Sequence, residues 1–360
     1  MRFIASAALA ALLAFAAAPV RAVEADTYAA LNKAAVETHI LPRYDALVTA
    51  TAALDGAAKT YCAAPAAKPI ADLQGAFGQT MDAWQDIQHV RFGPVDWFFR
   101  SQRFAFWPDP RNTIGKQMAE LLARHQAGSV DVELLARGSV ATQGLPALER
   151  LIFGDDAGKL KTGPEAAYRC RYVEAIAANL AQMAKETRAG WRDGGDKAFA
   201  AVMLDTSKPD APYREAQEAT LELFKALYLA VELASDHKLA RPLGAAIKDA
   251  RPRLAESWRS QRSLRNIRRN IAAARDLYLT GFAAGISDQA LDATIRDGFA
   301  KSLAAADTLK QPLEVAVADR AGRPQAEKLA AELVALKKLL GDRLPAALDI
   351  PVGFNALDGD

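Results

Sequence analysis

The stretch LQGAFGQTMDAWQDI, residues 73–87, decides the fold class of this chain. Its large apolar side chains recur every three or four residues, at Leu73, Phe77, Met81, Trp84 and Ile87. That spacing places them on one face of an α-helix, whereas a half-buried strand would alternate every second residue. An apolar helix face has to be covered by other elements, so the stretch predicts a packed helical core.

The same spacing recurs along the rest of the chain, and we interpret these stripes as seams between helices rather than as contacts to a cofactor. Helices are expected over residues 27–61, 70–91, 112–126 and 142–153, and then over 165–190, 213–236, 260–281, 288–309 and 324–341. We therefore predict an all-α fold of two packed helical bundles, each resembling a four-helix bundle, with a site at their junction.

Glycine, proline and charged residues divide these expected helices from one another. The stretch 154–164 is rich in Gly, Asp and Lys and is the best candidate for a boundary between the bundles. We predict an N-terminal bundle over residues 23–158 and a C-terminal bundle over residues 159–360.

The first 22 residues are typical of a secretory signal peptide. Arg2 precedes an apolar run, and Val20-Arg21-Ala22 offers a small residue at the cleavage site. No cysteine follows the run, so we expect no lipid anchor, and no later stretch is long and apolar enough for a membrane span. A periplasmic or secreted protein is predicted.

The charge balance of the remaining chain argues against one class of partner. The sequence has 45 Lys and Arg against 43 Asp and Glu, and the signal peptide removes Arg2 and Arg21. A neutral chain is a poor match for nucleic acid, so no nucleic-acid partner is expected.

The chain has two cysteines, Cys62 and Cys170. In an exported protein they are most simply one disulfide, and the alternative is two buried free thiols. A bridge closing so long a loop would contribute up to about 4–5 kcal/mol by loop-closure entropy.

A second informative stretch is Gly144-Leu145-Pro146-Ala147-Leu148-Glu149, at the start of an apolar helical segment. Proline suits the first turn of a helix, where its missing N–H has no intrahelical partner. Glu149 then carries a carboxylate beside a largely buried helix surface. It is either part of a ligand pocket or the partner of Arg150 in a surface ion pair.

Three other stretches carry candidate site residues. His39 shares a helix face with Arg43, four residues on, and is either a ligand or a structural histidine. The aromatic connection at residues 97–107 should be tucked between packed elements, as a plug or as the wall of a cleft with Arg103 and Asp109 as polar groups. In residues 256–269, Ser260 or Ser263 could cap a helix, and the arginines at 259, 262, 265, 268 and 269 form a solvated face or partly face Glu149 and Asp109.

These stretches resemble, in this order, the motifs of the imelysin-like family of secreted all-helical bacterial proteins. The family hallmark is Gly-x-His-x-x-Glu, and this chain is similar to it at residues 144–149 but has Pro146 in the histidine position. Similar features are an apolar-Pro-x-Tyr step after His39, Phe-Trp-Pro-Asp ending at Asp109, and a serine-rich helix start. The resemblance implies two bundles with the hallmark at their junction. It also implies a metallopeptidase, as the founding activity was described, or a role in iron regulation or uptake.

Three hypotheses follow for function. The first is a periplasmic, non-enzymatic protein that binds a small ligand or metal ion and works with a periplasmic or outer-membrane iron-system protein. The second is a metallopeptidase using Glu149, and the third is a scaffold with a relic site. The cofactor is unidentified, with a divalent cation or iron as candidates. The expected ligand-binding residues are Gly144, Pro146, Glu149, His39, Arg103, Trp107, Asp109 and Ser263, of which Glu149, His39 and Asp109 are the candidate metal ligands.

Overall fold

A computed structural model describes residues 23–123, 130–208 and 211–351 of the chain, so the predicted signal peptide lies outside the described residues. Within these ranges the fold is all-α and contains no strand, which confirms the predicted fold class. None of the helices in these ranges is both long and apolar enough to cross a membrane.

The first group of helices surrounds one long helix. Helix α1 (Ala25–Ala34) continues through a π-helical turn at Ala35–Ile40 into α2 (Leu41–Cys62). Helix α2 packs against α3 (Ile70–Gln85) and α8 (Ala166–Arg192), and α7 (Gly144–Phe153) packs against α3 and α8. The apolar stripe of residues 73–84 is buried in this group, at Leu73, Phe77, Met81 and Trp84.

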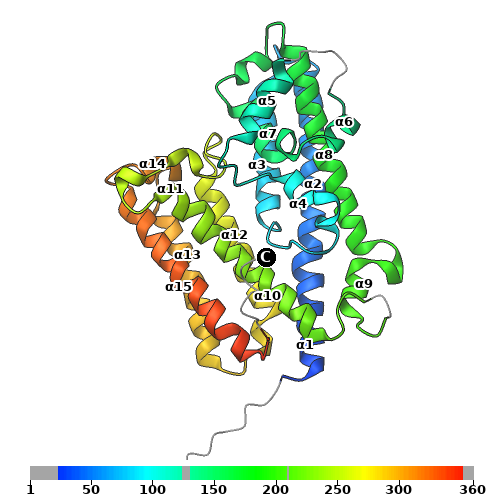
Figure 1. Cartoon of the computed structure of the whole chain (residues 1–360), viewed down its shortest axis with the longest axis vertical. Coiled ribbons are helices and arrows are strands. Elements are labelled where there is room, and N and C mark those ends of the chain that lie inside the picture. Colours follow the sequence, from blue (N-terminus) through cyan, green and yellow to red (C-terminus); the bar gives the residue numbers. More distant parts are fainter. Residues whose placement is uncertain (1–22, 124–129, 209–210, 352–360) are drawn as a thin grey trace, which may run out of the picture.

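The second group contains the helices of the C-terminal part (Figure 1). Helix α10 (Ala216–Glu232) packs against α12 (Ser263–Gly281), and α13 (Gln289–Thr308) packs against α12 and α15 (Arg323–Ala347). Helix α1 contacts α10 and α12, and α3 also contacts α12, so the two groups share an extended interface. The shorter helices are α4 (Arg100–Phe104), α5 (Thr113–Ala123), α6 (Val132–Arg137), α9 (Phe199–Leu204), α11 (Arg241–Leu243) and α14 (Leu313–Ala316).

Helix α8 shows how the packing relates to the predicted boundary at residue 158. It follows that boundary in the chain, yet it packs against α2, α6 and α7 of the first group. A disulfide joins Cys62 at the end of α2 to Cys170 in α8, with their Cα atoms 5.4 Å apart. The disulfide prediction is confirmed. The division into two domains stays a prediction, and α8 belongs with the first group by its contacts.

Several helix ends differ from the sequence expectation for local reasons. Helix α3 ends at Gln85 and not at residue 91, and turns occupy residues 86–89. The helix expected from residue 260 begins at Ser263 because Ser257 and Gln261 adopt left-handed backbone angles, with φ of 54° and 55°. Helix α10 runs on past residue 236 through a π-helical turn at Leu233–Ala240.

The aromatic connection at residues 97–107 is only partly buried. Phe104 is buried as expected, but Phe98 and Phe99 are 73% and 69% exposed and Trp97 is 46% exposed. Phe98 and Phe99 have φ of 57° and 56°, and this left-handed backbone accompanies side chains that stay at the surface. The expectation that the whole connection is tucked between helices is therefore wrong for residues 97–99.

Candidate functional site

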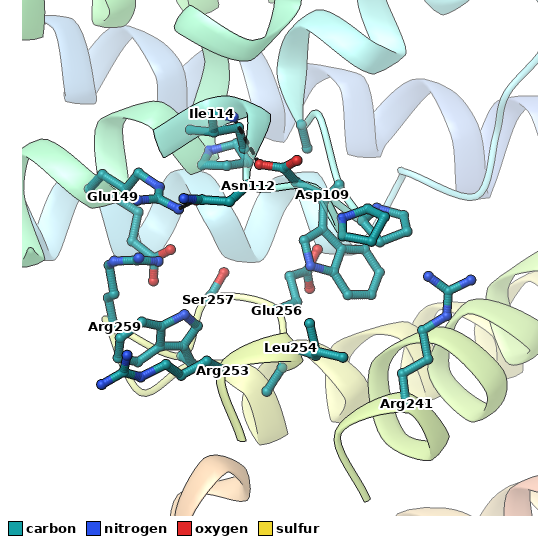
Figure 2. A pocket seen from close by; sticks show the side chains of 18 of the residues that line it. Asp109, Asn112, Ile114, Glu149, Arg241, Arg253, Leu254, Glu256, Ser257 and Arg259 are labelled. Carbon is teal, nitrogen blue, oxygen red and sulfur yellow. Dashed lines mark hydrogen bonds between the residues drawn. The ribbon is translucent and has the colours of Figure 1, made fainter. Parts of the chain in front are cut away.

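A pocket of about 490 Å³ lies between the first group of helices and the segment that precedes α12. Figure 2 shows Asp109, Asn112 and Glu149 on one wall, and Arg253, Ser257 and Arg259 on the facing wall. We call it the junction pocket. Its lining includes Trp107, Asp109, Asn112, Pro146, Glu149, Arg150, Asp155, Arg241, Arg253, Glu256, Ser257, Trp258 and Arg259.

Helix α7 is held against the pocket by its first residue. Gly144 has φ of 80°, and a Cβ atom there would lie 2.3 Å from the carbonyl oxygen of Arg103 and 2.6 Å from that of Phe104. Only glycine tolerates both the backbone angle and this close approach. The start of α7 therefore sits on the backbone of α4, with Pro146 and Glu149 facing the pocket.

The carboxylate of Glu149 is buried and bound on one side. Its side chain is 4% exposed, and Oε1 accepts hydrogen bonds from the backbone N–H (2.9 Å) and the hydroxyl (2.7 Å) of Ser260. No described residue donates a hydrogen bond to Oε2. Burial raises the pKa of Glu149, although the two bonds from Ser260 and the nearby charge of Arg259 act in the opposite direction.

The facing wall is a loop with an unusual backbone. Ser257 and Gln261 are in the left-handed region, and the Ser257 carbonyl accepts a bond from the Arg262 N–H (3.1 Å). It also lies 3.1 Å from the Ser260 hydroxyl oxygen, whose single proton has the shorter contact to Glu149. Non-glycine residues persist in this region only where the surroundings impose it, and they cluster at ligand sites. The loop thereby presents Ser260 and Arg259 to Glu149.

A buried ion pair lies behind the loop. Lys238 is 1% exposed, and its Nζ lies 2.9 Å from Glu256 Oε2 and 2.7 Å from Asn270 Oδ1. Gln85 and Asn266 donate to the same Glu256 oxygen at 3.1 and 2.8 Å. Burial lowers the pKa of Lys238, and the charge of Glu256 opposes that change. One pocket carboxylate is thus neutralised from inside the protein.

The structure brings together half of the eight residues that were expected to bind ligand. Trp107, Asp109, Pro146 and Glu149 line the junction pocket. Asp109 also caps α5, because its two oxygens accept the N–H groups of Thr113 (2.7 Å) and Ile114 (2.9 Å).

The other four do not line the pocket. Gly144 begins the same helix as Glu149, as described above. Arg103 donates to Gln143 and Asn179, at 3.1 and 3.0 Å. Ser263 donates to Glu314 at 3.3 Å. The side chains of Arg103 and Ser263 therefore form contacts between helical segments.

His39 lies in a different environment, paired with a second histidine. Its Nε2 is 3.0 Å from Nε2 of His89, and both side chains are buried. Burial lowers the pKa of both rings, that of His89 to about 3. The charge of Arg43 adds to this effect at His89, and the charges of His89 and then Arg43 add to it at His39. His39 does not line the junction pocket.

The side chains present at the pocket do not fit a metal ion. Across residues 23–123, 130–208 and 211–351, no three His, Cys, Asp or Glu side chains are grouped so that they could hold one. One oxygen of Glu149 and both of Asp109 already accept hydrogen bonds. Pro146 offers no donor one turn before Glu149, and four guanidinium groups line the same space.

Sequence reasoning missed several residues of the site. Ser260 was considered only as a helix cap, and Lys238 and Glu256 were not considered together. Arg259 was considered as one of a run of arginines that is solvated or partly faces Glu149 and Asp109. The signal for Glu256, Arg259 and Ser260 was a serine- and arginine-rich stretch in an otherwise regular pattern, and Lys238 lies outside that stretch. That signal marks a place on the chain without naming its partner, because Ser260 and Glu149 are 111 residues apart.

Comparison with known proteins agrees with this architecture. The family model described as Imelysin matches residues 40–340. Iron-regulated protein A of Synechococcus elongatus is 22% identical over 300 residues, covering 80% of this chain and 78% of that protein. An imelysin-like protein from Psychrobacter arcticum superposes with a TM-score of 0.75 at 19% identity, covering 93% of this chain and all of that one. A putative iron-regulated protein A precursor from Parabacteroides distasonis gives 0.70 at 18% identity, covering 91% and 97%. The two structures show a shared fold.

Proposed function

We propose that this chain, which belongs to the imelysin family, binds a small ligand without catalysing a reaction and serves an iron-linked system outside the cytoplasm. The observation that carries the proposal is the junction pocket, with the buried carboxylate of Glu149 held by Ser260. A concave site with a few fixed polar groups is what small-ligand binding requires.

The side chains at the junction pocket favour ligand binding over metal-dependent peptide hydrolysis. Such hydrolysis needs a metal that activates a water molecule and a base beside it. Glu149 could serve as the base, but Pro146 stands in the histidine position and His39 is engaged with His89. We therefore derive no hydrolytic step at this site.

The link to iron and the location rest on other observations. One relative is named iron-regulated protein A, and we propose the same physiological connection for this chain. The Cys62–Cys170 disulfide suits an oxidising compartment, in line with the signal peptide predicted at residues 1–22. We propose the periplasm as the location.

The test compares wild-type protein with the Glu149→Gln variant, and with Glu120→Gln as a matched control at an exposed position of α5. Each is incubated with an unfolded protein substrate, with and without chelator, and its metal content is measured by elemental analysis. We expect no cleavage that depends on Glu149 and no stoichiometric metal in any variant. Chelator-sensitive proteolysis that is lost only in Glu149→Gln would establish the peptidase instead.

The iron link is tested by protein abundance. We expect the amount of this protein to change between iron-limited and iron-replete cultures of the native bacterium, measured by quantitative immunoblot. An amount independent of iron supply would remove that part of the proposal and leave the binding function standing.

A further inference from the structure

The charged side chains of the junction pocket specify a class of ligand, an inference that rests on the binding function proposed above. We propose that the pocket binds a small polyanion, such as a polycarboxylate or its iron chelate, through the guanidinium groups of Arg150, Arg253 and Arg259. Arg241, which is exposed, lies on the same lining and adds positive charge.

The first support is that the pocket arginines form no close ion pair with a carboxylate of the described residues. Within the part of the chain that the structure describes, none of Arg150, Arg241, Arg253 and Arg259 forms an ion pair, and Arg150 donates only to the amide oxygen of Asn112, at 2.5 Å. Arg150 and Arg259 are half-buried. Burial removes part of the hydration of these two guanidinium groups. Nearby carboxylates attract them without forming an ion pair among the described residues, so the oxygens of a ligand would supply hydrogen bonds that the protein does not.

The second support is that most of the pocket's carboxylates are already engaged. Asp109 accepts two N–H groups of α5, Glu149 accepts both donors of Ser260, and Glu256 is paired with Lys238. Asp155, the remaining acid of the lining, is exposed. The charges of Asp109, Glu149 and Asp155 still attract Arg150 or Arg259. None of these acids bonds directly to a pocket arginine in the part of the chain that the structure describes, so the guanidinium N–H groups remain available to the oxygens of an incoming anion.

The third support is that two arginines are held in place before a ligand arrives. The guanidinium carbon of Arg259 lies 4.3 Å from the centre of the Trp258 ring, and that of Arg253 lies 5.5 Å from it. Stacking on an aromatic face suits arginine and restricts its side chain. A planar guanidinium fixed in this way can form paired hydrogen bonds to a carboxylate with little further loss of entropy.

The size of the pocket limits the ligand. Its volume of about 490 Å³ is in the range of sites for small molecules. A polycarboxylate that carries iron meets both the charge of the arginines and the iron-linked role proposed above, with the metal bound by the ligand itself and not by side chains of this protein.

The experiment measures binding of citrate, and of citrate loaded with Fe(III), to the mature protein by isothermal titration calorimetry, with sorbitol as a neutral probe. The variants are Arg150→Gln, Arg259→Gln and Arg259→Lys. Arg268→Gln is the matched control, because Arg268 pairs with Asp307 on α13, outside the pocket. Circular dichroism melting verifies that each variant is folded.

We expect citrate to bind wild-type protein and Arg268→Gln equally, with affinity that falls as salt is added. Arg150→Gln and Arg259→Gln should each bind roughly tenfold more weakly, and Arg259→Lys should fall between. Tighter binding of the iron-loaded form identifies the chelate as the ligand class, and equal binding identifies the free polycarboxylate.

Two results would overturn the inference. One is that neither form of citrate binds wild-type protein, and the other is that Arg259→Gln and Arg150→Gln bind as tightly as wild type. Either result can be told apart from a failure of the proposed non-enzymatic function. That failure would appear as Glu149-dependent proteolysis in the separate assay with an unfolded protein substrate.

Discussion

Two sets of arginines lie within a few residues of each other and are used differently. Arg253 and Arg259 line the junction pocket without an ion pair among the described residues. Arg262, Arg265 and Arg269 follow on the same stretch and pair with Asp82 in α3 and with Asp86, which directly follows the last residue of α3. We call this second set the α12 seam. The difference teaches that an arginine run acquires its role from what the fold places opposite each guanidinium.

The two sets of arginines should respond differently to substitution. Substitutions in the α12 seam should lower stability and leave ligand binding intact, since their partners are carboxylates of the protein. Substitutions of pocket arginines should do the reverse, because their partner is a ligand. The predictions below test this separation, beginning with the largest effect.

The largest effect is expected for Lys238→Ala, at the buried ion pair between the two regions. Removing the ammonium leaves Glu256, which is 6% exposed, as a buried charge without its cation. Breaking such a pair lowers stability by about 3–5 kcal/mol, measured by urea denaturation. The double variant Lys238→Met with Glu256→Gln should recover most of the loss. A single variant as stable as wild type would mean that the pair is not buried in solution.

The His39–His89 pair should make stability fall in acid. The pKa of each ring in the folded protein lies below 6.5, and that of His89 is about 3. Between these two pH values the unfolded chain therefore binds more protons than the folded protein. Stability should be complete above pH 6.5 and decrease by about 1.4 kcal/mol per pH unit for each histidine below it.

Within the α12 seam, the ion pairs of Asp82 should not contribute to this acid loss until a lower pH. Although burial acts to raise it, the guanidinium groups of Arg265 and Arg262 bring the pKa of Asp82 below its ordinary value. Urea denaturation at several pH values measures the acid loss, and the His89→Gln variant tests whether the histidine pair causes it. An unchanged pH dependence in His89→Gln would show that other groups cause the acid loss.

A smaller loss is expected for Asp82→Asn, which removes the partner of two arginines in the α12 seam. Asp82 and Arg262 are each 15% exposed, so their charged hydrogen bonds should contribute about 1.5–3 kcal/mol. Asp307→Asn is the matched control, because its pair with Arg268 is more than half exposed and should contribute less than about 1 kcal/mol. Citrate affinity should be unchanged in both. Equal losses in the two variants would contradict the importance of burial at the seam.

The smallest change in stability is expected for Arg259→Gln, the variant that weakens anion binding. Its guanidinium stacks on Trp258 and pairs with no carboxylate of the described residues. Its removal should change the free energy of unfolding by about 0.5 kcal/mol or less. A loss as large as that of Asp82→Asn would mean that Arg259 belongs to the structural set, and the separation between pocket and seam would then fail.

Much of the fold could be predicted because its causes are local. The stripe from Leu73 to Trp84 is buried in the first group of helices, as its spacing indicated. The helix over Gly144–Phe153 also begins and ends close to its predicted bounds. Predictions failed where the chain departs from helical spacing for tertiary reasons, as at Phe98 and Phe99, whose left-handed backbone and exposed rings no periodicity signals.

The site could be predicted only in part. The sequence points to Pro146, Glu149, Trp107 and Asp109 as ligand-binding residues, and the structure places all four on the pocket lining. The arginine run was expected to face Glu149 and Asp109 as one alternative, but their hydrogen-bond partners were not named. Nothing in the sequence indicates that Ser260 binds Glu149, or that His39 faces His89 and not the pocket.

The amino-acid sequence determines the helices and the breakers between them, because these depend on neighbours within a few residues. It also determines the pairing of its two cysteines, because each has only one possible partner. The tertiary structure decides which charges meet. A hydrogen bond or ion pair requires atoms to lie within a few ångströms, and residues separated by a hundred positions reach that distance only when all the intervening helices have packed. The same arginine-rich stretch therefore holds the protein together at α12 and is left open to a ligand at the junction pocket.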